Sequence, residues 1–103
     1  MPENLAGADI ERLVATPPGW TLADDRKSVS LSLEFSSFAD AWGFMSEIAI
    51  EADKLDHHPE WSNVYNRVAI KLTTHDADGL SARDQALADC IAAALQRRGK
   101  TGA

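Results

Sequence analysis

Apolar and polar residues alternate most regularly between positions 28 and 35, where every second side chain is apolar. The apolar positions are Val29, Leu31, Leu33 and Phe35, and serines fill most of the positions between them. A period of two is typical of a β-strand that buries one face. A shorter strand-like run, 20–22, precedes this segment across the polar turn 24–27. The first third of the chain therefore predicts two consecutive strands.

Three other segments repeat apolar residues at the helical spacing of three or four. The first covers residues 5–15, the second begins after Ser37, and the third begins after Ser81. Ser37 with Asp40 three positions later resembles a capping box. Ser81 is predicted to cap the last helix, with Asp84 at its third position. The sequence thus predicts three helices.

The middle helix carries the longest apolar stripe. Its members are Phe38, Ala41, Trp42, Met45, Ile48, Ala49, Ala52 and Leu55. A stripe of this length is suited to cover a sheet, so we interpret Trp42 and Met45 as core residues rather than as part of a cofactor site. The helix is expected to close at His57, because Pro59 pushes the residue before it, His58, out of the helical conformation.

Two further strand-like runs follow the proline. They are Trp61–Tyr65 and Val68–Thr73, and we place a two-residue hairpin loop between them at Asn66-Arg67. The elements then follow the order α-β-β-α-β-β-α, without the connections that a parallel sheet requires. We therefore expect an α+β fold, with a four-stranded antiparallel sheet and helices packed on one face. Residues 1–103 are expected to form a single domain with one core.

This hairpin brings distant histidines together. A loop at Asn66-Arg67 would pair Trp61 with Leu72 and place His58 opposite His75. Directly opposed residues in an antiparallel pair have Cβ atoms about 5 Å apart. The sequence therefore predicts that these two imidazoles are neighbours.

His57 joins the cluster from the end of the helix. Asp53 lies one helical turn earlier, so its carboxylate is expected to orient His57. Three imidazoles at one rim favour proton transfer, because histidine changes its charge near neutral pH. Acid-base catalysis without a metal is therefore our preferred interpretation of His57, His58 and His75.

Other interpretations of the cluster remain open. For any one of these histidines alone, we favour a structural role at the end of a helix or strand, and it is the convergence of all three that favours catalysis. A three-histidine metal site is a further alternative, although adjacent residues at a helix end diverge and no neighbouring cysteine supports a familiar ligand spacing. Nucleophilic catalysis is less favoured, since the serines and threonines nearby lack a Gly-x-Ser-x-Gly motif.

The net charge and the short apolar runs argue against two classes of protein, those that bind nucleic acid and those that span a membrane. The net charge is −6 with acidic residues scattered along the chain, which argues against nucleic-acid binding. The apolar runs are too short to span a membrane, and the first seven residues lack the features of a signal peptide. The expected location is therefore the cytoplasm. The single cysteine, Cys90, lies on an apolar helical stripe, and we interpret it as a buried structural thiol.

Several stretches together resemble a known family. Residues 53–68 read DKLDHHPEWSNVYNRV, and they are followed by LTTH at 72–75 and GLSARD at 79–84. This combination resembles the pterin-4a-carbinolamine dehydratases, and AWGFM at 41–45 is similar to that family too. The close match covers about residues 38–91, and the combined HHP, Tyr-Asn and Thr-His pattern is highly specific.

The resemblance implies a hydro-lyase that dehydrates 4a-hydroxytetrahydropterin to quinonoid dihydropterin, thereby recycling the cofactor of aromatic amino acid hydroxylases. It implies that His57, His58 and His75 are the acid-base set, and it leaves open which of them is the acid and which the base. The residues implied to contact the pterin are Asp53, Pro59, Thr74, Asp76 and Ala77. Many members of the family have glutamate at the position of Asp53, so the carboxylate of this chain is one methylene shorter.

The resemblance also carries expectations about cofactors and partners. It implies no metal and no separate cofactor, because the pterin is the substrate. The expected assembly is a homodimer or a tetramer, with a functional link to an aromatic amino acid hydroxylase. A non-catalytic dimerisation or assembly module on the same fold is the alternative, and the presence of all three histidines favours the enzyme.

Overall fold

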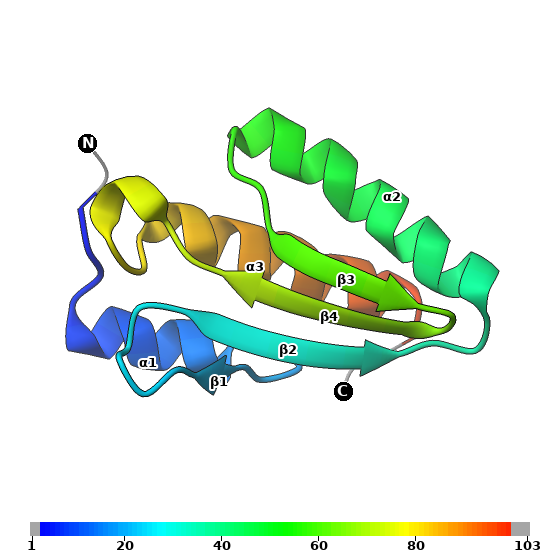
Figure 1. Ribbon diagram of the computed structural model, residues 1–103, viewed down its shortest axis with the longest axis horizontal. Helices are drawn as coiled ribbons and strands as arrows, with labels where there is room; N and C mark the ends of the chain where they lie inside the picture. Colours follow the sequence, from blue (N-terminus) through cyan, green and yellow to red (C-terminus); the bar gives the residue numbers. More distant parts are fainter. Residues whose placement is uncertain (1–2, 100–103) are drawn as a thin grey trace.

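The computed structural model describes residues 3–99, and its elements follow the predicted order (Figure 1). The helices are α1 (Gly7–Ala15), α2 (Phe38–Leu55) and α3 (Ala82–Arg97). The strands are β1 (Thr21–Leu22), β2 (Val29–Glu34), β3 (Glu60–Val64) and β4 (Arg67–Leu72), and a short 3₁₀ helix, η1 (His75–Ala77), follows β4. The predicted order α-β-β-α-β-β-α is confirmed, with η1 as the one addition among the described residues.

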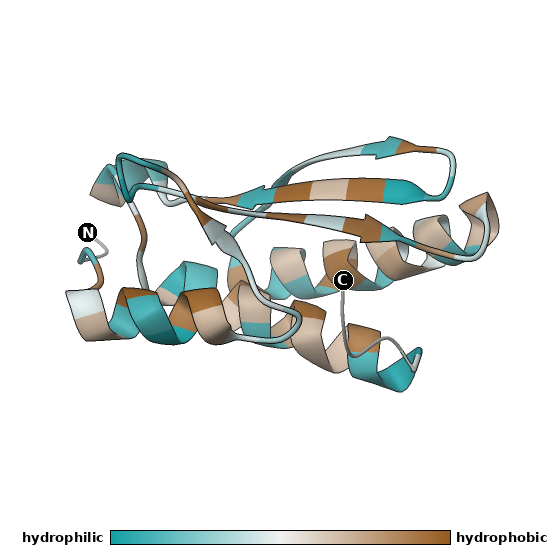
Figure 2. Cartoon of the chain, turned by 90° about the horizontal axis from the view of Figure 1, so that it is seen from below, coloured by the Kyte–Doolittle hydropathy of each residue, from teal (hydrophilic) through white to brown (hydrophobic). Residues whose placement is uncertain are grey.

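The four strands form one antiparallel sheet in the order β1-β2-β4-β3. Figure 2 shows the sheet as one layer and the three helices as a second layer beneath it. The expected α+β fold, with helices on one face of the sheet, is therefore confirmed.

The core lies between these two layers. Alternate residues of the two central strands point toward the helices and are buried, while their neighbours are exposed. The buried strand residues are Val29, Leu31, Leu33, Val68, Ile70 and Leu72. Full burial of one such side chain stabilises a fold by about 1.5–3 kcal/mol, so the alternation decides which face of the sheet the helices cover.

The buried face of α2 differs from the predicted stripe. It consists of Ala41, Phe44, Met45, Ile48 and Ala52. Trp42 was interpreted as core and is 56% exposed, because it lies on the outer side of α2, where its ring stacks on that of Phe38. Phe44 takes the core position and packs against Phe35, with ring centroids 5.0 Å apart.

No helix in residues 3–99 has the length and apolar character needed to cross a membrane.

The hairpin loop lies one residue earlier than predicted. Tyr65 and Asn66 form the turn, so Trp61 pairs with Ile70 instead of Leu72. Tyr65 takes a left-handed φ of 53°, and the side chain of Asn63 supports the turn by donating to the carbonyl oxygens of Tyr65 (3.0 Å) and Arg67 (2.8 Å). The register shift is two residues, which keeps every side chain on its predicted face.

Side chains cap both long helices. The hydroxyl of Ser81 and the carboxylate of Asp84 form a complete capping box at the start of α3. At α2, Ser37 accepts a hydrogen bond from the backbone N–H of Asp40, but the Asp40 carboxylate accepts from Ser36 instead of returning to Ser37. The capping box predicted at Ser37 is therefore only half formed.

Candidate functional site

A pocket of about 280 Å³ lies where α2 ends and where the chain leaves β4 for η1. The residues that line it are Asp56, His57, His58, Glu60, Thr73, Thr74, His75, Asp76 and Arg83. All three histidines predicted as catalytic thus border one pocket, together with Thr74 and Asp76. The other three predicted contact residues, Asp53, Pro59 and Ala77, do not line the pocket. Pro59 and Ala77 are adjacent in sequence to residues that do, and Asp53 is hydrogen-bonded to one of them, His58.

The end of α2 separates two adjacent histidines. Asp56 takes a left-handed conformation with φ 50°, and its N–H donates to carbonyl oxygens of the last helical turn. The chain therefore leaves the helix axis before His57, whose N–H still donates to the carbonyl of Ala52 at 3.1 Å. The His57 side chain turns inward and is 9% exposed, whereas His58 faces solvent.

His57 is held by a buried carboxylate. Its Nε2 lies 2.7 Å from Oδ1 of Asp84, whose side chain is completely buried. Asp84 Oδ2 accepts two further hydrogen bonds, from the hydroxyl of Thr74 (2.7 Å) and the N–H of Ser81 (3.0 Å). All three groups are directed at the carboxylate, which also caps the N-terminus of α3.

The charge of Asp84 determines the role of each His57 nitrogen. An ionised carboxylate only accepts hydrogen bonds, so Nε2 of His57 must carry the proton. Nδ1 then remains as the ring nitrogen that a substrate can use. A buried aspartate that orients a histidine in this way fixes its tautomer and the direction of its ring.

The expectation that Asp53 orients His57 is wrong. The Asp53 carboxylate instead lies 3.0 Å from Nε2 of His58. The i,i+4 spacing would have brought Asp53 to His57 only if the helix had continued through His57, but α2 ends at Leu55. Both side chains of the Asp53–His58 pair are largely exposed, at 82% and 60%. The pair is therefore screened by water, unlike the buried pair of His57.

His75 has a carboxylate neighbour as well. Its Nε2 lies 3.4 Å from Oε2 of Glu60, and its side chain is 84% exposed. Each histidine of the pocket is thus beside a different acid, one pair buried and two at the rim. The predicted pairing of His58 directly opposite His75 is not formed, because the strand pairing ends at Glu60 and Lys71.

Asp84 and Glu60 were missed as site residues by the sequence reasoning. A signal for Asp84 existed, because it precedes Leu87 and Ala88 by three and four positions and therefore shares the buried face of α3. A charged residue on an apolar stripe needs a buried partner. Its partner is 27 positions away, so nothing in the local sequence could identify His57.

The pocket does not gather ligands around one point. Within residues 3–99, no group of three or more His, Cys, Asp or Glu side chains is placed to hold one metal ion. The three imidazoles are instead each directed to their own carboxylate. That the site works without a metal stays a prediction.

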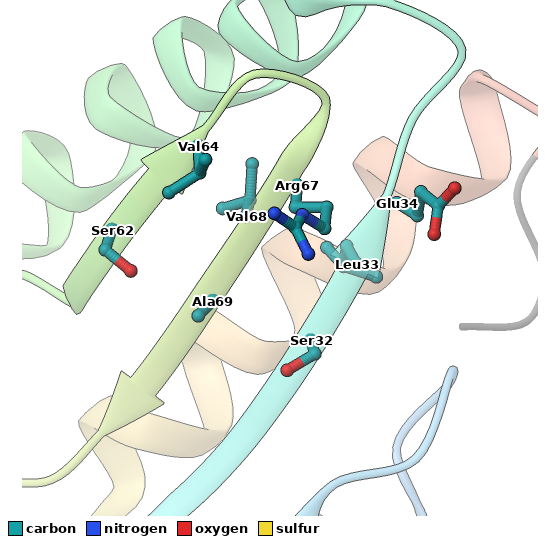
Figure 3. Close-up of a pocket in the computed structure, with 8 residues that line it drawn as sticks. All are labelled: Ser32, Leu33, Glu34, Ser62, Val64, Arg67, Val68 and Ala69. Carbon is teal, nitrogen blue, oxygen red and sulfur yellow. The ribbon is translucent and has the colours of Figure 1, made fainter.

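A second hollow, of about 450 Å³, lies on the face of the sheet that the helices leave uncovered (Figure 3). It is lined by Ser32, Leu33, Glu34, Ser62, Val64, Arg67, Val68 and Ala69. Glu34 and Arg67, which face each other across β2 and β4, are its charged members. The hollow is larger than the histidine pocket but offers no imidazole, so the chemistry favours the smaller one.

Comparison with known proteins shows which family this chain resembles. The model of the family described as "Pterin 4 alpha carbinolamine dehydratase" matches residues 3–94. The relatives named "Putative pterin-4-alpha-carbinolamine dehydratase" include the following two. One, from Rhizobium rhizogenes (strain K84), is 54% identical over 96 residues, which is 93% of this chain and 95% of that protein. The other, from Rhodospirillum rubrum, is 47% identical over 91 residues, covering 88% and 95%.

A solved structure shares the fold of this chain. It is the crystal structure of a protein from Brucella melitensis described as a transcriptional coactivator/pterin dehydratase. The TM-score is 0.83 at 37% identity, and the match covers 89% of this chain and 98% of the other. The chain therefore belongs to the pterin 4 alpha carbinolamine dehydratase family, a family of hydro-lyases.

Proposed function

We propose that this protein dehydrates a 4a-hydroxytetrahydropterin to the quinonoid dihydropterin by histidine acid-base catalysis. The observation that carries the proposal is the pocket that His57, His58 and His75 line together. Loss of water from the carbinolamine requires a proton for the departing 4a-hydroxyl group and removal of a proton from the neighbouring ring nitrogen. Two imidazoles in opposite protonation states supply both steps, and general acid-base catalysis of this kind contributes roughly 10²–10⁴-fold.

The three histidines differ in what they can contribute. His57 is oriented by the buried Asp84, so its Nδ1 has a fixed direction. His58 and His75 are exposed at the rim, where a bound pterin would cover them and strengthen their electrostatic interactions. A fixed buried imidazole and two imidazoles at the rim supply groups for both proton transfers.

We propose that the pterin is bound mainly by the segment that follows β4. Asp76 is exposed and lines the pocket, and Ala77 and Pro59 lie beside lining residues. The hydroxyl of Thr74 is already bonded to Asp84 and Ser81, so we assign Thr74 the task of holding that carboxylate. Asp53 would accept hydrogen bonds from the amino-pyrimidine edge of the pterin once His58 has turned toward the substrate.

The proposed reaction also suggests a metabolic partner for this protein. Dehydration returns an oxidised pterin to the pool from which a reductase restores the hydroxylase cofactor, so an aromatic amino acid hydroxylase is the proposed metabolic partner. The reaction needs no further cofactor. A homodimeric or tetrameric assembly and a cytoplasmic location are part of the same proposal.

A non-catalytic role is the alternative. The description of the Brucella melitensis protein names a transcriptional coactivator beside the dehydratase, which is the observation that supports it. In that case the fold would serve as an assembly module and the histidine pocket would have no catalytic task. The two functions differ in one measurable property, the acceleration of carbinolamine dehydration.

A rapid-mixing assay that generates the 4a-carbinolamine and follows its loss tests the proposal. We expect wild-type protein to accelerate dehydration, and His58→Ala or His75→Ala to lower kcat by on the order of 10-fold or more. Both side chains are exposed, so neither truncation opens a core cavity. Glu11→Ala, at an exposed position of α1, is the control. A wild-type protein without effect on the dehydration rate would contradict the proposal and favour the assembly module.

A further inference from the structure

The segment 74–79, which we call the His75 loop, is closed at its base by its own backbone. The N–H of Thr74 donates to the carbonyl of Gly79 at 2.8 Å, and the N–H of Gly79 donates back at 3.3 Å. Within the loop, the N–H of Ala77 donates to the carbonyl of Thr74 at 3.1 Å. These bonds make the loop compact, but they do not attach it to the rest of the protein.

One attachment comes from the N-terminal arm, residues 3–6, which runs beside the loop in Figure 1. The amide Nδ2 of Asn4 donates to the carbonyl oxygen of Ala77 at 2.8 Å. Ala77 is the last residue of η1, and carbonyl groups at the end of a helix need a partner from outside the helix. Next to Asn4, the N–H of Leu5 donates to the carbonyl of Leu80 at 2.9 Å. Ala6 is extended, so α1 begins at Gly7 instead of at Leu5 as predicted.

A second attachment comes from the turn between β1 and β2. Nζ of Lys27 lies 3.0 Å from Oδ2 of Asp78, and the carbonyl of Lys27 accepts a hydrogen bond from the hydroxyl of Thr73 at 2.7 Å. The two attachments meet at Gly79. A Cβ atom on Gly79 would lie 2.8 Å from Nδ2 of Asn4 and 3.9 Å from Cγ of Lys27.

We propose that Asn4 and Lys27 are positioning residues: by attaching the His75 loop to the rest of the protein, they hold the His75 imidazole at the edge of the pocket. His75 has no burial to fix it, since its side chain is 84% exposed and its ion pair with Glu60 spans 3.4 Å. The position of its imidazole therefore depends on where the loop is held. This inference rests on the proposed function, because the placement of His75 affects a rate only if His75 transfers a proton.

The experiment compares Asn4→Ala, Lys27→Met and the double variant with wild type. Hydrogen exchange of the Ala77 and Asp78 amides reports the stability of the loop without any assumption about activity. Loss of the Asn4 hydrogen bond should speed exchange by about 2- to 10-fold. Loss of the exposed Lys27–Asp78 ion pair should speed it by less, about 1.5- to 5-fold, and loss of both contacts by more than either alone. We expect kcat for dehydration to fall by a similar factor, with a smaller change in KM.

Matched controls separate positioning from general damage. Lys27→Arg keeps the charge opposite Asp78 and should retain both wild-type exchange and wild-type kcat. Glu3→Ala alters the arm next to Asn4, and Lys54→Met removes another exposed lysine, one that pairs with Glu51 at 3.6 Å instead of with a residue of the loop. Both controls should leave exchange in the loop unchanged.

The two readouts also distinguish this inference from the proposed function. Unchanged exchange in the double variant would overturn the inference, whatever the activity. Faster exchange with unchanged kcat would overturn the positioning role. A wild-type protein without dehydratase activity would refute the proposed function, and with it the catalytic part of this inference, while the exchange data would still establish the attachment of the loop.

Discussion

Nε2 of His57 and Oδ1 of Asp84 lie 2.7 Å apart, and this buried pair joins the end of α2 to the first turn of α3. The same carboxylate caps α3 and accepts a hydrogen bond from the hydroxyl of Thr74. One side chain therefore serves the fold and the pocket together. A change at Asp84 should affect both, and the two effects can be measured separately.

Replacing Asp84 by Asn is expected to lower both stability and rate. The amide keeps the size of the side chain but removes the charge and presents an N–H₂ group to some of the donors around it. Loss of satisfied buried hydrogen bonds should reduce the free energy of unfolding by about 1–3 kcal/mol, measured by denaturant titration. The kcat for dehydration should fall by roughly 10-fold or more, because the tautomer of His57 is no longer fixed. Wild-type kcat in a folded variant would show that Asp84 has only a structural role.

Asp53→Asn makes the same chemical change at the exposed pair and is the matched comparison. An exposed ion pair contributes about 0.2–1 kcal/mol at most, so the free energy of unfolding should change little. In NMR spectra, the ring signals of His58 should shift while those of His57 stay in place, because Asp53 contacts His58. A shift confined to His57 would contradict the geometry described above.

Removal of metal ions should leave the activity intact. The described residues offer no cluster that could hold a metal, and proton transfer by imidazole needs none. Dehydration rates are to be compared before and after exhaustive treatment with a chelator, alongside metal analysis of the purified protein. A stoichiometric metal whose removal abolishes activity, and whose return restores it, would refute this prediction.

Cys90 is expected to react slowly with alkylating reagents. Partial burial raises the pKa of the Cys90 thiol, and the carboxylates of Glu51 and Asp89 raise it further. A raised pKa leaves less thiolate at a given pH, and the thiolate is the reactive form. Alkylation at pH 8 should therefore be slower in the folded protein than in the urea-unfolded chain, and Glu51→Gln should speed it. Equal rates in the folded and unfolded states would show that the fold does not protect this thiol.

The sequence alone determined the order of the elements, the buried face of each central strand and the segment that holds the histidines. These features depend on local periods of two and of three to four residues, which are visible in the chain itself. The predicted strand faces are correct although the predicted turn is wrong. Moving the loop from Asn66-Arg67 to Tyr65-Asn66 changes the register by two residues, and an even shift leaves each side chain on the same face of the sheet. The buried face of α2 was less certain, since adjacent apolar residues such as Ala41 and Trp42 fit more than one stripe.

Only the tertiary structure decided which carboxylate meets which histidine. A left-handed residue at Asp56 turns the chain after α2, so Asp53 reaches His58 and His57 turns inward. The partner of His57 comes from α3, 27 positions later, and the attachment of Asn4 to the His75 loop spans 73 positions. Contacts between such distant residues depend on how the helices pack on the sheet, and no local period of the sequence encodes that packing.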